Sequence, residues 1–185
     1  MQRFTPLILP GGAVLDVACG SGRHLAWLLQ QGRVPTGVDR DAAALAPWQG
    51  RAEVLVADLE AALWPLPGRR FDAVLVTNYL WRPLWPALRD ALTEGGVLIV
   101  ETFAHGQQTI GKPSRPEFLL QPGELLAAFA GLRVVAFEDG FEDTAAGLGS
   151  APSARFVQRL CAVRQAATSA NSPLPPRYGL QRVGS

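Results

Sequence analysis

An acidic residue followed by small residues marks the stretch from Val14 to His24, which reads VLDVACGSGRH. Asp16 lies in an apolar run typical of a buried strand, and Ala18, Gly20 and Gly22 follow before a helix-like segment begins. Because large side chains are missing there, a ligand can lie against the backbone, and the N–H groups at a helix start attract anions. The stretch therefore predicts a nucleotide-like ligand at the carboxyl end of the first strand.

Two more acids follow apolar, strand-like runs. Asp39 ends the run at 34–39, and Asp58 comes directly after the run at 52–57. The carboxyl ends of parallel strands meet at one edge of a sheet, so these acids are expected to lie close to the glycine turn. A carboxylate only accepts hydrogen bonds and can hold two hydroxyl groups. A dinucleotide site is disfavoured, because Leu25 stands where the third glycine of its fingerprint belongs.

The rest of the chain predicts an α/β fold with a mostly parallel sheet covered on both faces. Strands are expected at 13–18, 34–39, 52–57, 71–77 and 96–102. Helices are expected at 23–31, 41–48, 82–92 and 122–130, and a turn at 94–96. The β-rich stretches 132–139 and 154–163 predict an antiparallel hairpin at the end of the sheet.

Length and composition predict one domain and no membrane segment. The chain has 185 residues and 48% hydrophobic residues, so we expect a single domain at 1–165 and a flexible, Pro- and Ser-rich tail at 166–185. The formal net charge is +1, with the basic residues spread out, which makes a nucleic-acid partner unlikely. Cys19 and Cys161 suggest no disulfide framework, and no apolar run approaches the ~20 residues of a membrane span. We expect a cytoplasmic protein.

The acids and the turn together resemble the class I S-adenosylmethionine-dependent methyltransferases, over roughly 12–163. The first motif of that family is an acid followed by alternating glycines, here Asp16, Ala18, Gly20 and Gly22. The resemblance implies a three-layer, Rossmann-like methyltransferase fold. It also implies a seven-stranded sheet of order 3-2-1-4-5-7-6 with strand 7 antiparallel, and S-adenosyl-L-methionine as the cofactor.

The resemblance also implies where the cofactor binds. It places Asp39 at the ribose hydroxyls, Asp58 near the adenine amino group, and Arg23 near the carboxylate of the methionine part. The residues that we expect to bind the cofactor lie in the turn and at the strand ends: Asp16, Ala18, Cys19, Gly20, Ser21, Gly22, Arg23, Asp39, Arg40, Asp58, Leu59 and Asn78. Cys19 is interpreted as a small packing residue rather than a nucleophile.

The implied reaction moves a methyl group by in-line displacement. The positive charge of the sulfonium already activates the leaving group, so the protein's main task is to align acceptor, methyl group and sulfur in a dry pocket. A general base is optional. The candidates are Tyr79, Glu101 and His105, which stand at or just past the ends of central strands. Each also has a structural interpretation, as core packing, a loop contact and an exposed loop residue. We interpret His24 as a packing or cofactor-proximal residue rather than a catalyst. No spacing of Cys and His indicates a metal site.

The acceptor is expected to be a small molecule, because the chain shows neither a basic face nor an added recognition domain. Trp81 and Trp85 could wall an apolar acceptor pocket or simply be buried. Arg82 and Arg115 could bind an anionic acceptor or be surface charges. The long loop at 102–120 either covers the site or leaves it open.

Three alternatives stay open from the sequence. The chain could methylate RNA or protein, with Arg155, Arg159 and Arg164 as contacts. It could be a catalytically silent module that binds S-adenosylmethionine. An NAD-linked oxidoreductase is the remaining competitor, since Asp39 would serve a ribose there too. The oligomeric state is left open.

Overall fold

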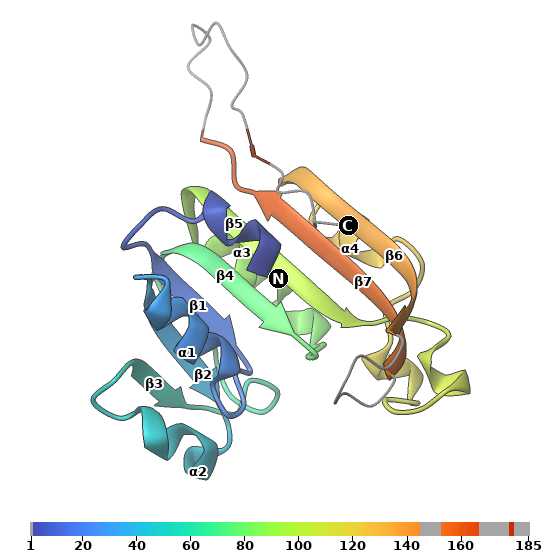
Figure 1. The fold of residues 1–185 in the computed structure, drawn as a ribbon, viewed down its shortest axis with the longest axis horizontal. Helices are drawn as coiled ribbons and strands as arrows, with labels where there is room; N and C mark the ends of the chain where they lie inside the picture. The colour runs from blue at the N-terminus through green and yellow to red at the C-terminus, as the bar shows by residue number, and fades with distance from the viewer. Residues whose placement is uncertain (1, 145–152, 167–177, 180–185) are drawn as a thin grey trace, which may run out of the picture.

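The computed structural model describes residues 2–144, 153–166 and 178–179 (Figure 1). They contain one seven-stranded sheet of order β3-β2-β1-β4-β5-β7-β6. The strands are β1 (Ala13–Val17), β2 (Val34–Asp39), β3 (Glu53–Val56), β4 (Phe71–Thr77), β5 (Leu92–Phe103), β6 (Arg133–Thr144) and β7 (Ser153–Val163). The predicted strand order and fold class are confirmed.

The sheet changes its direction of progression between β1 and β4. β1 pairs in parallel with β2 on one side and with β4 on the other, so the crossovers run outward in both directions from this point. Open α/β sheets bind ligands at such a switch point. At the far end, β7 pairs antiparallel with both β5 and β6, which confirms the predicted hairpin.

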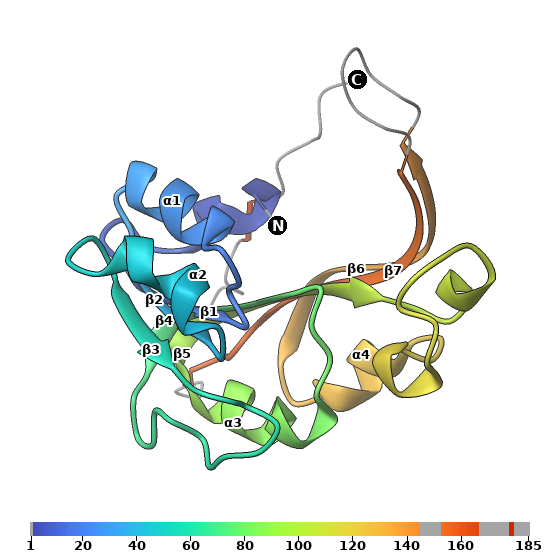
Figure 2. The ribbon, with the colours of Figure 1, turned by 90° about the horizontal axis from the view of Figure 1, so that it is seen from below.

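Short helices cover both faces of the sheet (Figure 2). One face carries η1 (Gln2–Leu7), α1 (Arg23–Gln30), α2 (Ala42–Leu45) and η2 (Ala46–Trp48). The other carries η3 (Arg82–Leu84), α3 (Trp85–Asp90) and α4 (Glu124–Ala128), while η4 (Gln107–Thr109) and η5 (Pro116–Phe118) belong to the loop after β5. The expected helix at 82–92 is split, because a proline stands in the first turn of both η3 and α3, where its missing N–H costs nothing.

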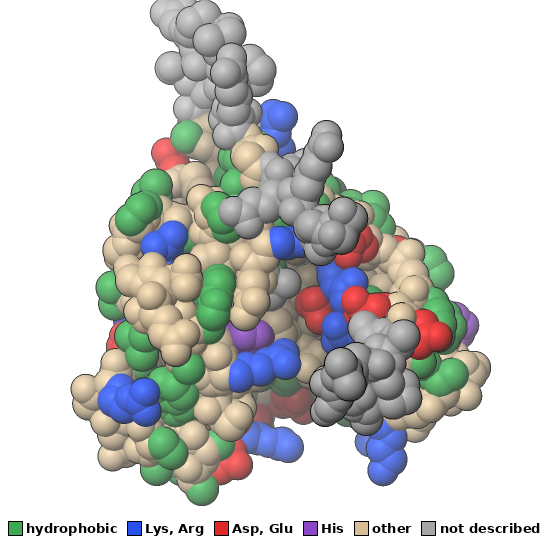
Figure 3. All heavy atoms as spheres, in the orientation of Figure 1, with side chains coloured by type: hydrophobic (Ala, Val, Ile, Leu, Met, Phe, Trp, Pro, Cys, Tyr) green, Lys and Arg blue, Asp and Glu red, His purple; other side chains and the backbone are tan. Residues whose placement is uncertain are grey.

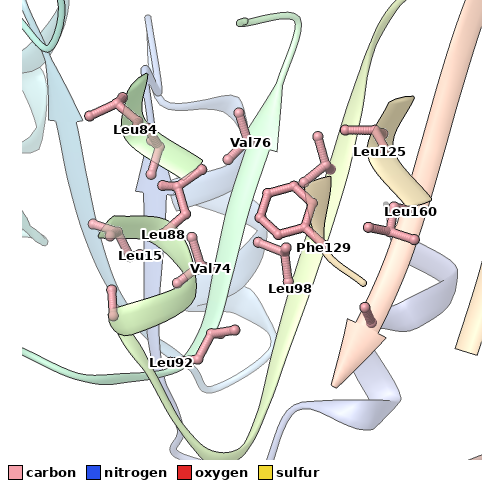
Figure 4. Packing of buried hydrophobic residues seen from close by; sticks show 14 of the residues in the cluster. Leu15, Val74, Val76, Leu84, Leu88, Leu92, Leu98, Leu125, Phe129 and Leu160 are labelled. Atoms are coloured by element: carbon pink, nitrogen blue, oxygen red, sulfur yellow. The ribbon is translucent and has the colours of Figure 1, made fainter. Parts of the chain in front are cut away.

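Two apolar clusters hold the layers together. Figure 4 shows part of the larger one, in which Leu84 of η3, Leu88 of α3 and Phe129 after α4 pack on sheet residues such as Leu15 and Leu98. Burial of each such side chain contributes about 1.5–3 kcal/mol. Trp81 and Trp85 pack against this cluster. Both indoles are half-buried against the core, and both also line a small apolar cavity on this face.

The second cluster lies on the face that carries η1 and α1. Phe4 and Ile8 are buried there, together with Leu28 of α1 and Ile99 of β5. Tyr178, from the segment predicted to be a flexible tail, packs against the same cluster, and the guanidinium of Arg133 lies 5.5 Å from its ring. The rest of the predicted tail, at 167–177 and 180–185, lies outside the described residues, so its flexibility stays a prediction.

The turn predicted at 94–96 is a bulge inside β5. The pairing with β4 jumps from Phe71 opposite Leu92 to Ala73 opposite Val97. Gly95 takes a left-handed φ of 79° at this point, and its N–H donates to the carbonyl of Arg164 at 2.7 Å. The glycine pair thus shifts the register of a continuous strand instead of ending a turn.

The loop after β5 is anchored away from the glycine turn. The guanidinium of Arg82 donates to the carbonyls of Glu117 and Leu119, and the amide oxygen of Gln107 accepts the N–H of Phe156. The loop thus lies against η3 and β7 (Figure 2).

Within the part of the chain that the structure describes, no helix is long and apolar enough to cross a membrane.

Candidate functional site

The turn after β1 is built from left-handed residues. Ala18, Gly20 and Gly22 have φ values of 52°, 55° and 79°. At Gly22 a Cβ atom would lie 2.3 Å from the indole of Trp48, whose Nε1–H donates to the carbonyl of Ser21. Gly22 is thus required by packing as well as by conformation. Ala18 holds the same conformation with a methyl group, which costs about 1–2 kcal/mol.

Asp39 ties this turn to the end of β2. Its carboxylate accepts the N–H of Gly20 at 2.7 Å and the N–H of Asp41 at 2.9 Å. A carboxylate has further lone pairs on both oxygens, so Asp39 can still accept bonds from ligand hydroxyls.

A cavity of about 190 Å³, which we call the acid pocket, lies at the carboxyl ends of β1 to β4. It brings together much of the predicted cofactor site and adds two residues beside Asp58 that the sequence analysis missed, Ala57 and Glu60. Asp58 accepts the N–H of Glu60 through Oδ1 at 2.9 Å. The lining consists of Ala18, Asp39, Arg40, Ala57, Asp58, Leu59, Glu60 and Tyr79.

A second cavity of about 420 Å³, which we call the polar hollow, opens on the face of η1 and α1. In Figure 3 basic and acidic side chains surround a depression on this face. Two lining residues come from the segment before the first strand, where no sequence signal pointed to them. The lining consists of Gln2, Arg3, Arg23, His24, Thr77 and Glu101. No residue from 104–120 lines either cavity, which favours the alternative in which this loop leaves the site open.

Asp16 lies beneath these cavities and lines neither of them. Its side chain is 1% exposed, and neither carboxylate oxygen has a hydrogen-bond partner among the described residues. His24 is close by, with Nδ1 3.7 Å from Oδ1 of Asp16. Burial raises the pKa of Asp16, while the nearby His24 opposes that shift. Neighbouring residues cover both oxygens in this structure, so the role of Asp16 in cofactor binding stays a prediction.

Comparison with known proteins identifies the family. Residues 14–96 match a family model described as a methyltransferase domain. The sheet order, with its antiparallel β7, is the one that the sequence resemblance implied. The match identifies a methyltransferase domain at residues 14–96, within a fold consistent with the class I S-adenosylmethionine-dependent methyltransferases. Its acid pocket and polar hollow lie at the edge of a methyltransferase sheet.

Curated relatives share part of this methyltransferase chain. The tRNA U34 carboxymethyltransferase of Haemophilus influenzae strain PittGG is 31% identical over 115 residues, covering 55% of this chain and 36% of the relative. The Vibrio vulnificus strain YJ016 enzyme of the same name is 32% identical over 123 residues, covering 58% and 38%. The chain spans little more than a third of the length of these relatives.

Solved structures share the fold. TehB from Haemophilus influenzae superimposes with a TM-score of 0.71 at 15% identity, covering 87% of this chain and 60% of that one. The glycopeptide N-methyltransferase MtfA, solved with S-adenosylmethionine, gives 0.59 at 19% identity, covering 88% and 91%. At these identities the likeness concerns the architecture alone.

The structure does not leave Glu101 as a free base. Its carboxylate pairs with Arg159 Nε at 2.7 Å and with Arg155 at 3.1 Å. Burial opposes ionisation of Glu101, but the hydrogen bond and charge of Arg159, with the charge of Arg155, outweigh it and lower the pKa. A carboxylate held in this way accepts a proton poorly at neutral pH.

Tyr79 and His105 are also poorly placed as bases. Burial and the nearby charges of Glu60 and Asp58 raise the pKa of Tyr79, so its hydroxyl stays protonated at neutral pH. His105 is exposed on the loop after β5, with Nδ1 3.5 Å from the amide of Gln108, and it lines neither cavity. The structure therefore does not bring His105 to the site.

Neither cavity is lined by Cys19, Ser21, Asn78 or Arg82. Burial raises the pKa of the Cys19 thiol to about 12, which favours the packing interpretation over a nucleophile. Ser21 and Asn78 are exposed and line neither cavity, although the N–H of Asn78 donates to the carbonyl of Glu101 at 2.8 Å. Arg82 pairs with Glu124, which leaves it unsuited to an acceptor anion. Among the described residues, no group of His, Cys, Asp and Glu could hold a metal ion.

Proposed function

We propose that this methyltransferase moves a methyl group from S-adenosylmethionine to a polar acceptor in the polar hollow. The proposal depends on one observation: the two cavities lie next to each other, at the switch point between β1 and β4. Thr77 lines the polar hollow, and Tyr79, two residues later, lines the acid pocket. A cofactor lying across this point would have its adenosine on one side and its sulfonium on the other.

The acid pocket fits an adenosine group. Asp39 keeps lone pairs for the two ribose hydroxyls beyond its backbone bonds. Asp58 uses Oδ1 for the N–H groups of Glu60 and Ala61, which leaves Oδ2 for an amino group of adenine. Leu59 is buried and supplies an apolar surface for a planar ring.

The methionine end would reach the start of α1. Arg23 is exposed, lines the polar hollow and has no ion pair with any residue described in the structure, so it can receive a carboxylate. When bound, the cofactor supplies an electrophilic methyl group: an acceptor lone pair forms the new bond as the carbon–sulfur bond breaks, with its electrons passing to sulfur. The protein's part is to align these atoms and to receive the acceptor's proton.

The hollow favours a polar acceptor. All of its lining side chains are polar or charged, and Trp81 and Trp85 lie on the other face of the sheet. This composition supports a small polar molecule as the acceptor.

A nucleoside of tRNA is a second acceptor class, which the names of the curated relatives favour. Arg155 and Arg159, expected as RNA contacts, are instead paired with glutamates, and Arg164 donates to backbone carbonyls. In this reading, RNA phosphates would meet Arg40 at the rim of the acid pocket, while Arg23 holds the carboxylate of the cofactor.

The cofactor is tested by calorimetric titration with S-adenosylmethionine, S-adenosylhomocysteine and NAD side by side. We expect the first two to bind and NAD to give no heat of binding. Binding of NAD alone would refute the proposal.

The acceptor class is tested with S-adenosylmethionine carrying an isotopic label in its methyl group. The protein is incubated with bulk unmodified tRNA or with a pooled extract of polar metabolites. Label in nucleosides after digestion supports tRNA, and label in small molecules supports the first acceptor class. No label in either mixture, from protein that binds S-adenosylmethionine, would contradict both.

A further inference from the structure

His24 lies between the buried Asp16 and the polar hollow. It stands in the first turn of α1, its side chain is 12% exposed, and it lines the polar hollow. Its Nδ1 atom lies 3.7 Å from Oδ1 of Asp16 and 3.4 Å from Oγ1 of Thr77. Its Nε2 atom makes no hydrogen bond with any residue that the structure describes.

The environment of Asp16 explains this orientation. A buried carboxylate without a partner is costly, and both oxygens of Asp16 lack one among the described residues. The imidazole of His24 is the ionisable group beside it. A small closing movement would let Nδ1–H donate to Asp16, and such bonds are often long before substrate binds. That bond fixes the proton on Nδ1 and leaves the lone pair of Nε2 facing the hollow.

We propose that His24 is the general base of the methyl transfer and that the buried Asp16 is its positioning residue. This inference rests on the proposed function. As the acceptor atom's lone pair forms its bond to the methyl carbon and the carbon–sulfur bond breaks toward sulfur, the acceptor's proton passes to Nε2 of His24. Asp16 then stabilises the imidazolium through Nδ1–H. The proton later leaves Nε2 for solvent, which restores the base.

The other charged groups near His24 are paired or exposed to solvent, so Asp16 has the main electrostatic effect on the imidazole. From η1, Arg3 faces the hollow but is paired with Glu138. From β5, Glu101 is paired with two arginines. Arg23, on the same helix turn, is exposed and screened by solvent. Asp39, the remaining acid near Asp16, is held by backbone N–H groups of the turn.

The orientation is tested without substrate or cofactor, by nitrogen-15 NMR of the imidazole. His24 and His105 are the two histidines of the chain, and His105→Gln leaves one to observe. We expect neutral His24 to carry its proton on Nδ1, whereas free histidine prefers Nε2. Asp16→Asn should weaken this preference for Nδ1, since a neutral amide is a weaker hydrogen-bond acceptor than a carboxylate. A proton on Nε2 in the parent protein would overturn the proposal even if the Asp16 variant did not fold.

The chemistry is tested with whichever acceptor takes the label. His24→Ala should reduce turnover by about 10²–10⁴-fold, the usual range for a lost general base, and added imidazole should restore part of it. The affinity for S-adenosylmethionine should change by less than about threefold, which would place the loss in the chemical step. Gln30→Ala, an exposed change on the same helix, should leave turnover unchanged.

Full turnover in His24→Ala would overturn the proposal. If the parent protein does not bind S-adenosylmethionine, the proposed function fails, while the NMR result for the Asp16–His24 pair still stands.

Discussion

Asp16 and Glu101 stand on the same sheet, with β4 between their strands, and the protein treats their carboxylates in opposite ways. Asp16 is fully buried without a hydrogen bond in the described structure, and burial raises its pKa. Glu101 is paired with two arginines that lower its pKa. A carboxylate with hydrogen-bonded partners stabilises the fold. A buried carboxylate without them lowers stability, and a functional role explains why it is kept; we assign this role to the positioning of His24.

The ion-paired group around Glu101, here named the charged wall, consists of Arg3, Glu101, Glu138, Glu142, Arg155 and Arg159. Arg155 and Arg159 each bind both Glu101 and Glu142. Arg159 also binds Glu138, which pairs with Arg3 of η1. The charged wall therefore links the first helical segment to the β6–β7 hairpin across one side of the polar hollow.

The largest effect is expected from Arg159→Met. This change leaves three glutamates short of a partner in a partly buried setting, and should lower the free energy of unfolding by about 3 kcal/mol. The control is Arg69→Met, whose pair with Glu53 is exposed and should be worth less than about 1 kcal/mol. Urea denaturation of both variants checks the difference, and equal losses would show that the charged wall is not special.

A change of opposite sign is expected from Asp16→Asn. Removing a buried charge that lacks a hydrogen bond should raise the free energy of unfolding at pH 7 by on the order of 1 kcal/mol. Asp72→Ala is the matched comparison, because Asp72 accepts the N–H of Ala13 at 2.9 Å and its loss should destabilise the fold. Destabilisation by Asp16→Asn would contradict our inference that buried Asp16 lowers the free energy of unfolding.

The pH dependence of stability should separate the two acids. Glu101, Glu138 and Glu142 have lowered pKa values, so their contribution is complete above the usual value of 4.5 and is lost as pH falls through the lowered values. Asp16 has a raised pKa, so its cost grows as pH rises above the usual value of 3.8. Unfolding free energies from about pH 3 to 8 should show the advantage of Asp16→Asn growing with pH. A constant advantage would mean that ionisation is not its cause.

The smallest effect is expected at the turn that joins the two regions. Ala18→Gly should stabilise the protein by about 1 kcal/mol, because glycine adopts the left-handed φ of 52° without the Cβ conflict. Ala26→Gly, inside α1, should instead cost about 1 kcal/mol. Thermal unfolding of the pair measures both signs, and a loss in Ala18→Gly would show that Ala18 is not strained.

The sequence predicts the strands well because buried parallel strands are continuous apolar runs whose ends are marked by acids and glycines. The same logic places Asp39 and Asp58 at one edge, and the structure brings them to one cavity. The prediction of a turn at Gly95 is wrong, because a glycine pair is equally suited to a turn and to a bulge. Only the pairing with β4 decides between them.

The partners of Glu101 were beyond a reading of the chain alone. Arg155 and Arg159 are four residues apart and so share one face of β7, but their approach to Glu101 depends on the register of β5 with β7. The Asp16–His24 pair has a similar origin, since the turn must fold the start of α1 back onto β1 before the two side chains meet.

The central claim is that S-adenosylmethionine binds at the carboxyl edge through Asp39. Its most direct test is calorimetric titration of S-adenosylmethionine into the parent protein, Asp39→Ala, and the exposed-site control Asp90→Ala. Loss of charge-assisted bonds predicts that Asp39→Ala weakens binding by about 1.5–3 kcal/mol, roughly ten- to 150-fold in the dissociation constant, while Asp90→Ala matches the parent. An unchanged dissociation constant in Asp39→Ala would contradict the account.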